Sequence, residues 1–133
     1  METTIKKYLG IDWGTTRIGL ALADKETNIA LPFRVVNSFS EVVEVIKQEE
    51  IDEIIIGQPQ KMSGAAADNP LWLSFVDQLK TRVGLPIHLL DERLSSLAAD
   101  ALDGNQNEKA ERDSLAAAII LQSYLDQTYY GRD

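Results

Sequence analysis

Three carboxylates occupy positions where acidic side chains could do chemistry. Asp12 ends an apolar, strand-like segment, Glu92 follows another such segment, and Asp113 begins the last predicted helix. Carboxylate oxygens are the ligands that Mg²⁺ and Mn²⁺ prefer. Two such ions, held roughly 3.5–4 Å apart, can activate water and stabilise the leaving oxygen of a phosphodiester. If the fold brings these residues together, the sequence predicts an Mg²⁺ or Mn²⁺ site.

Asp12 is the most informative of the three. An aspartate within a strand signal runs against strand propensity, so it needs a metal, a partner or an exposed strand end. Its more ordinary interpretation is a turn aspartate that accepts hydrogen bonds from backbone amides. We favour a functional role because Gly14 would let a ligand approach the backbone closely, and Gly10 and Gly19 remove side-chain bulk nearby.

Glu92 and Asp113 also have ordinary explanations. Glu92 could belong to a solvated charge cluster with Asp91 and Arg93, although its expected place at the same sheet edge as Asp12 favours a function. Asp113 could be a first-turn carboxylate, which the helix dipole stabilises by about 0.3–1 kcal/mol. However, its neighbours on the helix face are alanines and an isoleucine, where an unpaired carboxylate would be costly. The alanines should also let the helix pack closely, which brings Asp113 towards Asp12.

The elements that must position these residues follow from hydrophobic patterning and from turn and cap signals. In the second of the predicted helices, Leu71, Phe75 and Leu79 should form the inner stripe. We expect strands over 8–12, 17–23, 29–36, 54–56 and 86–90, and helices that begin near Ser38, Asn69, Ser95 or Ser96, and Glu111.

A hairpin and two crossovers determine the expected topology. The first two strands are close in sequence and should pair antiparallel, and Pro32 suggests that the third lies at an edge. The two later βαβ connections should be right-handed and make the first, fourth and fifth strands parallel. The sequence therefore predicts an α/β fold with a five-stranded mixed sheet, in the order 3-2-1-4-5, flanked by helices. Asp12 and Glu92 then share the edge where open α/β sheets bind ligands.

Composition limits the classes of protein. The 133 residues suit one domain, and the absence of cysteine excludes disulfides and thiol chemistry. We expect no signal peptide and no membrane segment, because the N-terminus is polar and no apolar run approaches roughly 20 residues. The expected location is the cytoplasm. We interpret His88, the only histidine, as a strand side chain rather than a base.

The net charge of −8 argues against a general nucleic-acid binder, because phosphate contacts need lysine and arginine. It does not argue against a nuclease. A metal site built from carboxylates is itself acidic, and bound cations reverse the local sign of the charge.

Four segments, in order and at suitable spacing, resemble the motifs of the YqgF-type, Holliday-junction-resolvase-like nucleases. Residues 10–21 resemble the opening motif, and residues 57–64 resemble a Gly-x-Pro motif followed by a glycine-containing loop. Residues 90–96 resemble the Asp-Glu-Arg-Leu segment, and residues 113–125 the closing helix. Each match alone is weak, but together they span nearly the whole chain and are highly specific.

This resemblance implies one RNase H-like nuclease domain over residues 1–133, in a bacterial family of pre-16S rRNA nucleases. It also implies that Asp12, Glu92 and Asp113 are the catalytic residues and metal ligands. The chain departs from the family at Gln58, which is often aliphatic, and at the Ser95-Ser96 pair, which is usually threonine. A further departure concerns residues 104–112, which contain only two basic residues where many members carry a basic stretch.

Our leading hypothesis is a divalent-metal-dependent endonuclease that matures the 5′ end of precursor 16S rRNA in ribosome biogenesis, with branched DNA as a second substrate. Its partners would be precursor rRNA and ribosomal particles, and it would be a monomer or a homodimer. Basic side chains near the expected site could contact phosphates. These substrate-binding candidates are Arg17, Lys61, Arg93, Lys109 and Arg112.

Three other hypotheses remain open. The first is a Holliday-junction or branched-DNA resolvase. The second, supported by the low basic content, is a weakly catalytic RNA-binding assembly factor. The third is an ATP-binding domain of the actin and sugar-kinase type, whose phosphate loops also follow the Gly-x-Asp-x-Gly-Thr-Thr pattern of residues 10–16. Those enzymes close two domains around the nucleotide, whereas this chain is long enough for one.

Overall fold

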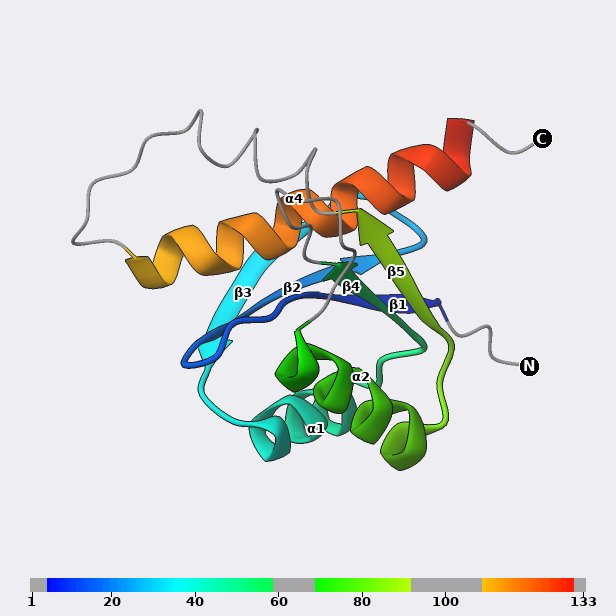
Figure 1. The fold of residues 1–133 in the computed structure, drawn as a ribbon. Helices are drawn as coiled ribbons and strands as arrows, with labels where there is room; N and C mark the ends of the chain where they lie inside the picture. The colour runs from blue at the N-terminus through cyan, green and yellow to red at the C-terminus, as the bar shows by residue number, and fades with distance from the viewer. Residues whose placement is uncertain (1–4, 59–68, 92–108, 131–133) are drawn as a thin grey trace.

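A five-stranded mixed sheet lies between helices in the computed structural model, which describes residues 5–58, 69–91 and 109–130. The strands are β1 (Lys7–Asp12), β2 (Ile18–Asp24), β3 (Leu31–Val36), β4 (Glu53–Gln58) and β5 (Ile87–Asp91). The helices are α1 (Phe39–Gln48), α2 (Pro70–Val83) and α4 (Lys109–Tyr130). Figure 1 shows α4 on one side of the sheet, and α1 and α2 on the other.

The strand order β3-β2-β1-β4-β5 confirms the predicted topology. β1 pairs antiparallel with β2 and parallel with β4, and β4 pairs parallel with β5. β3 is an edge strand, as Pro32 suggested. α4 begins two residues before the predicted start at Glu111 and ends at Tyr130. The short helix predicted from Ser95 or Ser96 lies outside the described residues.

The predicted cap residues begin the first two helices. The Ser38 hydroxyl accepts a hydrogen bond from the backbone N–H of Glu41, and the Glu41 carboxylate accepts one from the N–H of Asn37. At α2, the Asn69 side chain accepts from two backbone N–H groups of the first turn. Gly84 ends α2 with φ of 65°, a left-handed conformation that favours glycine.

The sheet buries both faces, so its central strands alternate between two cores. Ile54 and Ile56 pack towards α1 and α2, whereas Ile55 packs towards α4. β1 alternates in the same way, with Leu9 on the first face and Tyr8 on the second. The same alternation determines on which face of the sheet each later side chain of β1 lies.

The inner stripe of α2 differs from the prediction at its first member. Leu71 is 60% exposed, and the buried residues of α2 are Trp72, Phe75, Val76 and Leu79. These four follow the i, i+3, i+4, i+7 spacing of one helix face, and Leu71 falls just outside it.

Within the described residues, we find no helix with the length and apolar character to cross a membrane.

Candidate active site

The β1–β2 register places Asp12 and Asp113 on the same face of the sheet. Asp12 is the last residue of β1 and lies opposite Gly19 of β2. Directly opposed residues of an antiparallel pair present their side chains on one face, and Gly19 lies against the backbone of Asp113 in α4. The fold therefore brings two of the three predicted carboxylates, 101 positions apart in the chain, to one end of the sheet.

Protein atoms fill the space beside the three glycines that surround Asp12. A side chain at Gly19 would collide with the carbonyl oxygen of Asp113, and a Cβ at Gly10 would lie 2.7 Å from Cβ of Leu121. A Cβ at Gly14 would lie 2.7 Å from the Arg17 carbonyl oxygen. The absence of side chains at Gly10 and Gly19 therefore makes room for α4, and the approach of a ligand at Gly14 stays a prediction. The three glycines allow α4 to approach the sheet and the loop after β1 to turn tightly.

Asp113 forms an ion pair with Arg17. The Arg17 Nε donates a hydrogen bond of 2.6 Å to Oδ2 of Asp113, and the two side chains are 41% and 26% exposed. Asp113 is the fifth residue of α4, and the dipole effect weakens beyond the first helical turn. A charge-assisted bond to Arg17 therefore explains this carboxylate better than the helix dipole does.

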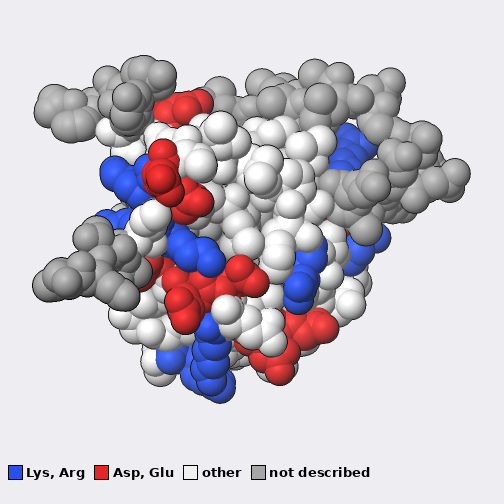
Figure 2. Space-filling view, turned by 180° about the vertical axis from the view of Figure 1, so that it is seen from behind, with Lys and Arg blue, Asp and Glu red and all other residues white. Residues whose placement is uncertain are grey.

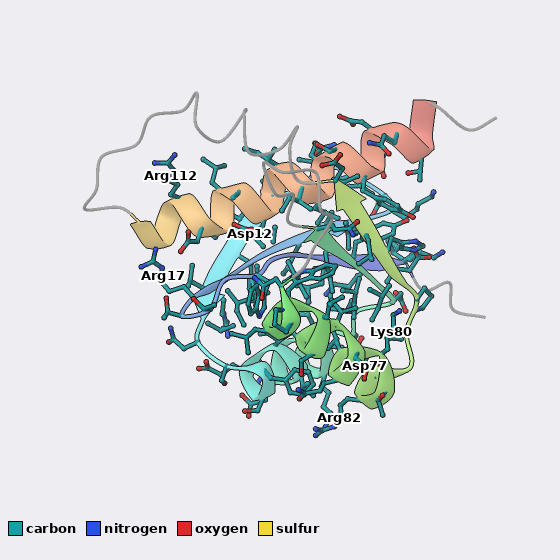
Figure 3. All side chains as sticks on the ribbon, viewed as in Figure 1. Asp12, Arg17, Asp77, Lys80, Arg82 and Arg112 are labelled. Atoms are coloured by element: carbon teal, nitrogen blue, oxygen red, sulfur yellow. The ribbon has the colours of Figure 1, made fainter. Side chains whose placement is uncertain are left out.

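The other predicted site residues are less completely described. Glu92, Arg93 and Lys61 lie outside the described residues, and of Lys109 only the backbone is described. Arg112 is half-buried at the start of α4. Figure 3 shows Asp12, Arg17 and Arg112 at one end of the molecule, away from Asp77, Lys80 and Arg82 of α2.

The carboxylates at this end of the sheet are of the chemical type that binds a divalent cation. Asp12 and Asp113 are half-buried and supply carboxylate oxygens, which Mg²⁺ and Mn²⁺ prefer. No group of three or more histidine, aspartate or glutamate residues that could hold a metal occurs within residues 5–58, 69–91 and 109–130. The third predicted ligand, Glu92, lies beyond those ranges, directly after the last residue of β5. Arg17 already holds one oxygen of Asp113, so a cation there would compete with it.

A pocket beside Trp13, lined by uncharged residues in the described part of the chain, is a feature that the sequence analysis missed. Its volume is about 240 Å³, and its lining includes Trp13, Phe39, Phe75 and Gln78. The only signals in the sequence were an aromatic residue directly after Asp12 and another at the start of α1. Because the pocket combines the β1–β2 loop, α1 and α2, no single segment predicts it.

A second polar cluster lies away from Asp12, at the start of β4. Lys6 Nζ is 2.8 Å from Oε2 of Glu53, and His88 Nε2 is 3.1 Å from Oε1 of the same carboxylate. Burial alone would raise the pKa of Glu53, but the hydrogen bond and charge of Lys6, with a contribution from His88, lower it. Burial and the nearby Glu53 raise the pKa of Tyr8 and of Tyr124.

This cluster explains His88 without a catalytic role. The imidazole stacks on the Tyr124 ring of α4, with the ring centroids 4.9 Å apart. His88 is therefore a strand side chain of β5, as the sequence indicated.

The charges on the rear face of the molecule are mixed. Figure 2 shows basic side chains next to acidic ones around a broad uncharged centre, rather than one basic surface. On that face, the described residues give phosphates no continuous positive track. Any nucleic-acid contact by Arg17 and Arg112 would be local to the end of the sheet that carries Asp12.

Solved structures of resolvases share this architecture. Thermus thermophilus RuvC in complex with a Holliday junction substrate aligns with a TM-score of 0.61 at 18% identity, covering 95% of this chain and 96% of that one. The yeast mitochondrial Holliday junction resolvase Ydc2 aligns with a TM-score of 0.50 at 15% identity, covering 90% and 78%. At these identities the likeness shows the fold alone, which is RNase H-like.

Sequence relatives identify the family. A protein from Maridesulfovibrio salexigens named "Putative pre-16S rRNA nuclease" is 40% identical over 131 residues, covering 90% of this chain and 97% of the relative. One of the same name from Chloroflexus aurantiacus is 32% identical over 130 residues, covering 89% and 85%. The model of a family described as "RuvX: Holliday junction resolvase" matches residues 6–127. This chain, with its RNase H-like fold, therefore belongs to the RuvX family and is a nuclease.

Proposed function

We propose that this nuclease is a divalent-metal-dependent endonuclease that matures the 5′ end of precursor 16S rRNA. The observation that carries the proposal is the placement of Asp12 beside the Asp113 segment of α4, through the Asp12–Gly19 pair. Relatives named as pre-16S rRNA nucleases favour precursor rRNA as the substrate. The working partners would be precursor rRNA or ribosomal particles that contain it.

The proposed ligands of the cation are Asp12, Asp113 and Glu92. When bound there, Mg²⁺ or Mn²⁺ would supply the activation of water and the stabilisation of charge that phosphodiester hydrolysis needs. Asp12 lies at the end of a central strand, where it pairs with Gly19 of β2, and the preceding residue, Ile11, pairs with both β2 and β4. Such support from the scaffold limits the movement of a ligand.

Arg17 would position Asp113 and bind phosphate. Its hydrogen bond of 2.6 Å holds one carboxylate oxygen of Asp113 in the resting protein. A guanidinium also binds phosphate oxygens well. If a cation takes over the Asp113 oxygen, the Arg17 side chain becomes available to the substrate. Arg112, one residue before Asp113, supplies a second positive charge to the same end.

The test is cleavage of precursor 16S rRNA by the pure protein with Mg²⁺ or Mn²⁺, with the ends of the products mapped. We expect 5′-phosphate products and a loss of at least about 100-fold in Asp12→Asn, because changes to the partners of metal ligands already cost 10–100-fold. The control is Asp77→Asn, which removes an exposed carboxylate of α2 away from the site. Full activity in Asp12→Asn would refute the mechanism.

Branched DNA is the alternative substrate, because the matching family is described as Holliday junction resolvases. A four-way DNA junction and precursor 16S rRNA, each tested at equal concentration, distinguish the two. Faster cleavage of the junction, with symmetric cuts, would make resolution the main activity. Faster cleavage of the RNA at its mature 5′ end supports the rRNA proposal.

A further inference from the structure

The pocket beside Trp13 is small, and the described residues that line it are uncharged and include three aromatic side chains. Phe75 is buried, whereas Trp13 and Phe39 line the pocket half-buried. The rings of Trp13 and Phe75 are 6.3 Å apart at 42°, and those of Phe39 and Phe75 are 5.9 Å apart at 87°. Aromatic rings of three different segments thus converge, and two of them keep exposed surface for a ligand.

The polar rim of the pocket suits a ligand with both hydrogen-bond donors and acceptors. Asn37 Nδ2 donates to the carbonyl oxygen of Thr16, and Gln78 Nε2 donates to Oγ of Ser74. These bonds orient the two exposed amides at the pocket mouth. Base edges present the same mixture of donors and acceptors, and RNA-binding proteins read unpaired bases in this way.

Charge and size limit the occupant further. None of the described residues that line the pocket is charged, in a chain with 21 acidic residues, so a ligand attached to phosphates meets no carboxylate among them. The volume of about 240 Å³ is below the roughly 300–1,000 Å³ of pockets for drug-sized ligands. A single planar ring system fits these limits better than a larger molecule does.

The location connects the pocket to the cleavage site. Trp13 directly follows Asp12, and the tight turn at Gly14 leads to Arg17, which reaches Asp113. Asp12 lies on the α4 face of the sheet and Trp13 packs on the α1–α2 face, so a strand with a phosphate at Asp12 would cross the end of the sheet to place a nearby nucleotide at Trp13. We propose that this pocket binds one unpaired base of the strand that is cleaved, stacked on Trp13 and Phe39; this inference rests on the proposed nuclease function.

The proposal explains how a strongly acidic protein selects structured nucleic acid. Stacking of a base on aromatic side chains contributes without any positive charge. Unstacking a base is easiest where it is already unpaired, so the pocket would favour junctions of paired and single-stranded segments. Fully paired substrates would not fill it.

The variant Gln78→Phe tests the pocket by filling its mouth. Gln78 is exposed on α2, and we place it outside the catalytic residues. The matched control is Thr81→Phe, which adds the same ring at an exposed, uncharged position of α2 that does not line the pocket. Thermal unfolding of both variants verifies that each is folded.

Binding is measured by fluorescence anisotropy, without divalent metal and at low salt, on an RNA hairpin with a single-stranded tail. A series of matched RNAs carries one abasic site at successive tail positions. In the wild type, we expect the abasic site at one position to weaken binding on the order of tenfold. Gln78→Phe should weaken binding of the intact RNA by a similar factor and show no further loss with that abasic RNA. Thr81→Phe should behave as the wild type.

Trp13 gives a direct second measurement, because the other tryptophan, Trp72, is only 2% exposed. The intact RNA should quench the emission of Trp13, and the abasic RNA should quench it less. Equal binding of intact and abasic RNAs at every position, or wild-type behaviour of Gln78→Phe, would overturn the inference. If the pocket binds something other than a base, intact and abasic RNAs will also bind equally, and the inference is overturned.

Cleavage assays separate this inference from the proposed function. Asp12→Asn should lose cleavage and keep the base-dependent binding. If the wild type shows base-dependent binding but cleaves no RNA or DNA, the nuclease mechanism fails and the pocket stands. If the wild type cleaves but Gln78→Phe binds both RNAs normally, the pocket fails and the nuclease stands.

Discussion

Arg17 Nε and Asp113 Oδ2 lie 2.6 Å apart, across 96 positions of sequence, and join the turn after β1 to the second turn of α4. This contact holds one proposed catalytic carboxylate, Asp113, next to the loop that directly follows the other, Asp12. Both side chains keep part of their surface in solvent, so the contact can be exchanged for another ligand.

Removing either partner of this ion pair should have a modest effect on stability. We expect a coupling energy of about 0.5–1 kcal/mol between Arg17→Ala and Asp113→Asn, because half-exposed ion pairs are screened by solvent. The measurement is urea unfolding of the wild type, the two single variants and the double variant. Strict additivity would show that the contact does not form in solution.

The same ion pair should oppose metal binding. In Arg17→Ala, the Asp113 carboxylate loses its cationic competitor, so we expect Mn²⁺ to bind several-fold more tightly. Titration calorimetry of wild type and Arg17→Ala measures this difference, with Arg82→Ala as a control for the loss of one exposed arginine elsewhere. Weaker Mn²⁺ binding in Arg17→Ala would mean that Arg17 supports the metal site rather than competes with it.

Gly19→Ala should damage both stability and activity. The new methyl group would collide with the backbone of Asp113, and overpacking of this kind typically costs about 1–3 kcal/mol. α4 must then move away from β2, which carries Asp113 away from Asp12.

Gly84→Ala is the control for this change, because Gly84 has open space around it and only its φ of 65° is unfavourable for alanine. Its cost should be about 1–2 kcal/mol, with no effect on cleavage. Chemical denaturation and the cleavage rate of both variants test the difference. Equal cleavage rates would contradict the proposed role of the α4 contact.

Glu53 should make the protein less stable in acid. Its pKa in the folded protein is below the ordinary 4.5, so it contributes stability above that pH and loses it as pH falls through the lowered pKa. The loss should be small, because Lys6 is exposed and solvent screens its attraction to Glu53. Thermal unfolding between pH 7 and pH 3 should therefore show a smaller acid effect in Glu53→Gln than in the wild type. An identical pH dependence would exclude this contribution.

The topology was predictable because each local signal agreed with the others. The capping residues Ser38 and Asn69, the edge proline Pro32 and the continuous apolar run at Ile54 each specify one element and its surroundings. Right-handed crossovers then leave few ways to order the strands. The meeting of Asp12 and the Asp113 segment follows from that order and from the strand register.

The side-chain contacts of the site were not predictable from sequence patterns. The pairing of Arg17 with Asp113 depends on the conformation of a loop, and no periodicity encodes it. The glycines at positions 10 and 19 gave a signal for close approach, but the sequence does not say whether a ligand or a helix approaches. The burial of Leu71 was wrongly predicted for a simpler reason. A shift of one position along a helix is enough to move a side chain from the buried stripe into solvent.

The most direct test of the central claim is Mn²⁺ binding to the wild type and to Asp12→Asn, with Asp77→Asn as the control. If Asp12 and the Asp113 segment form a metal centre, the wild type and Asp77→Asn will bind Mn²⁺ equally, and Asp12→Asn will bind it at least about tenfold more weakly. Equal Mn²⁺ affinity in all three proteins would contradict the metal centre, whatever nucleic acid the protein cleaves.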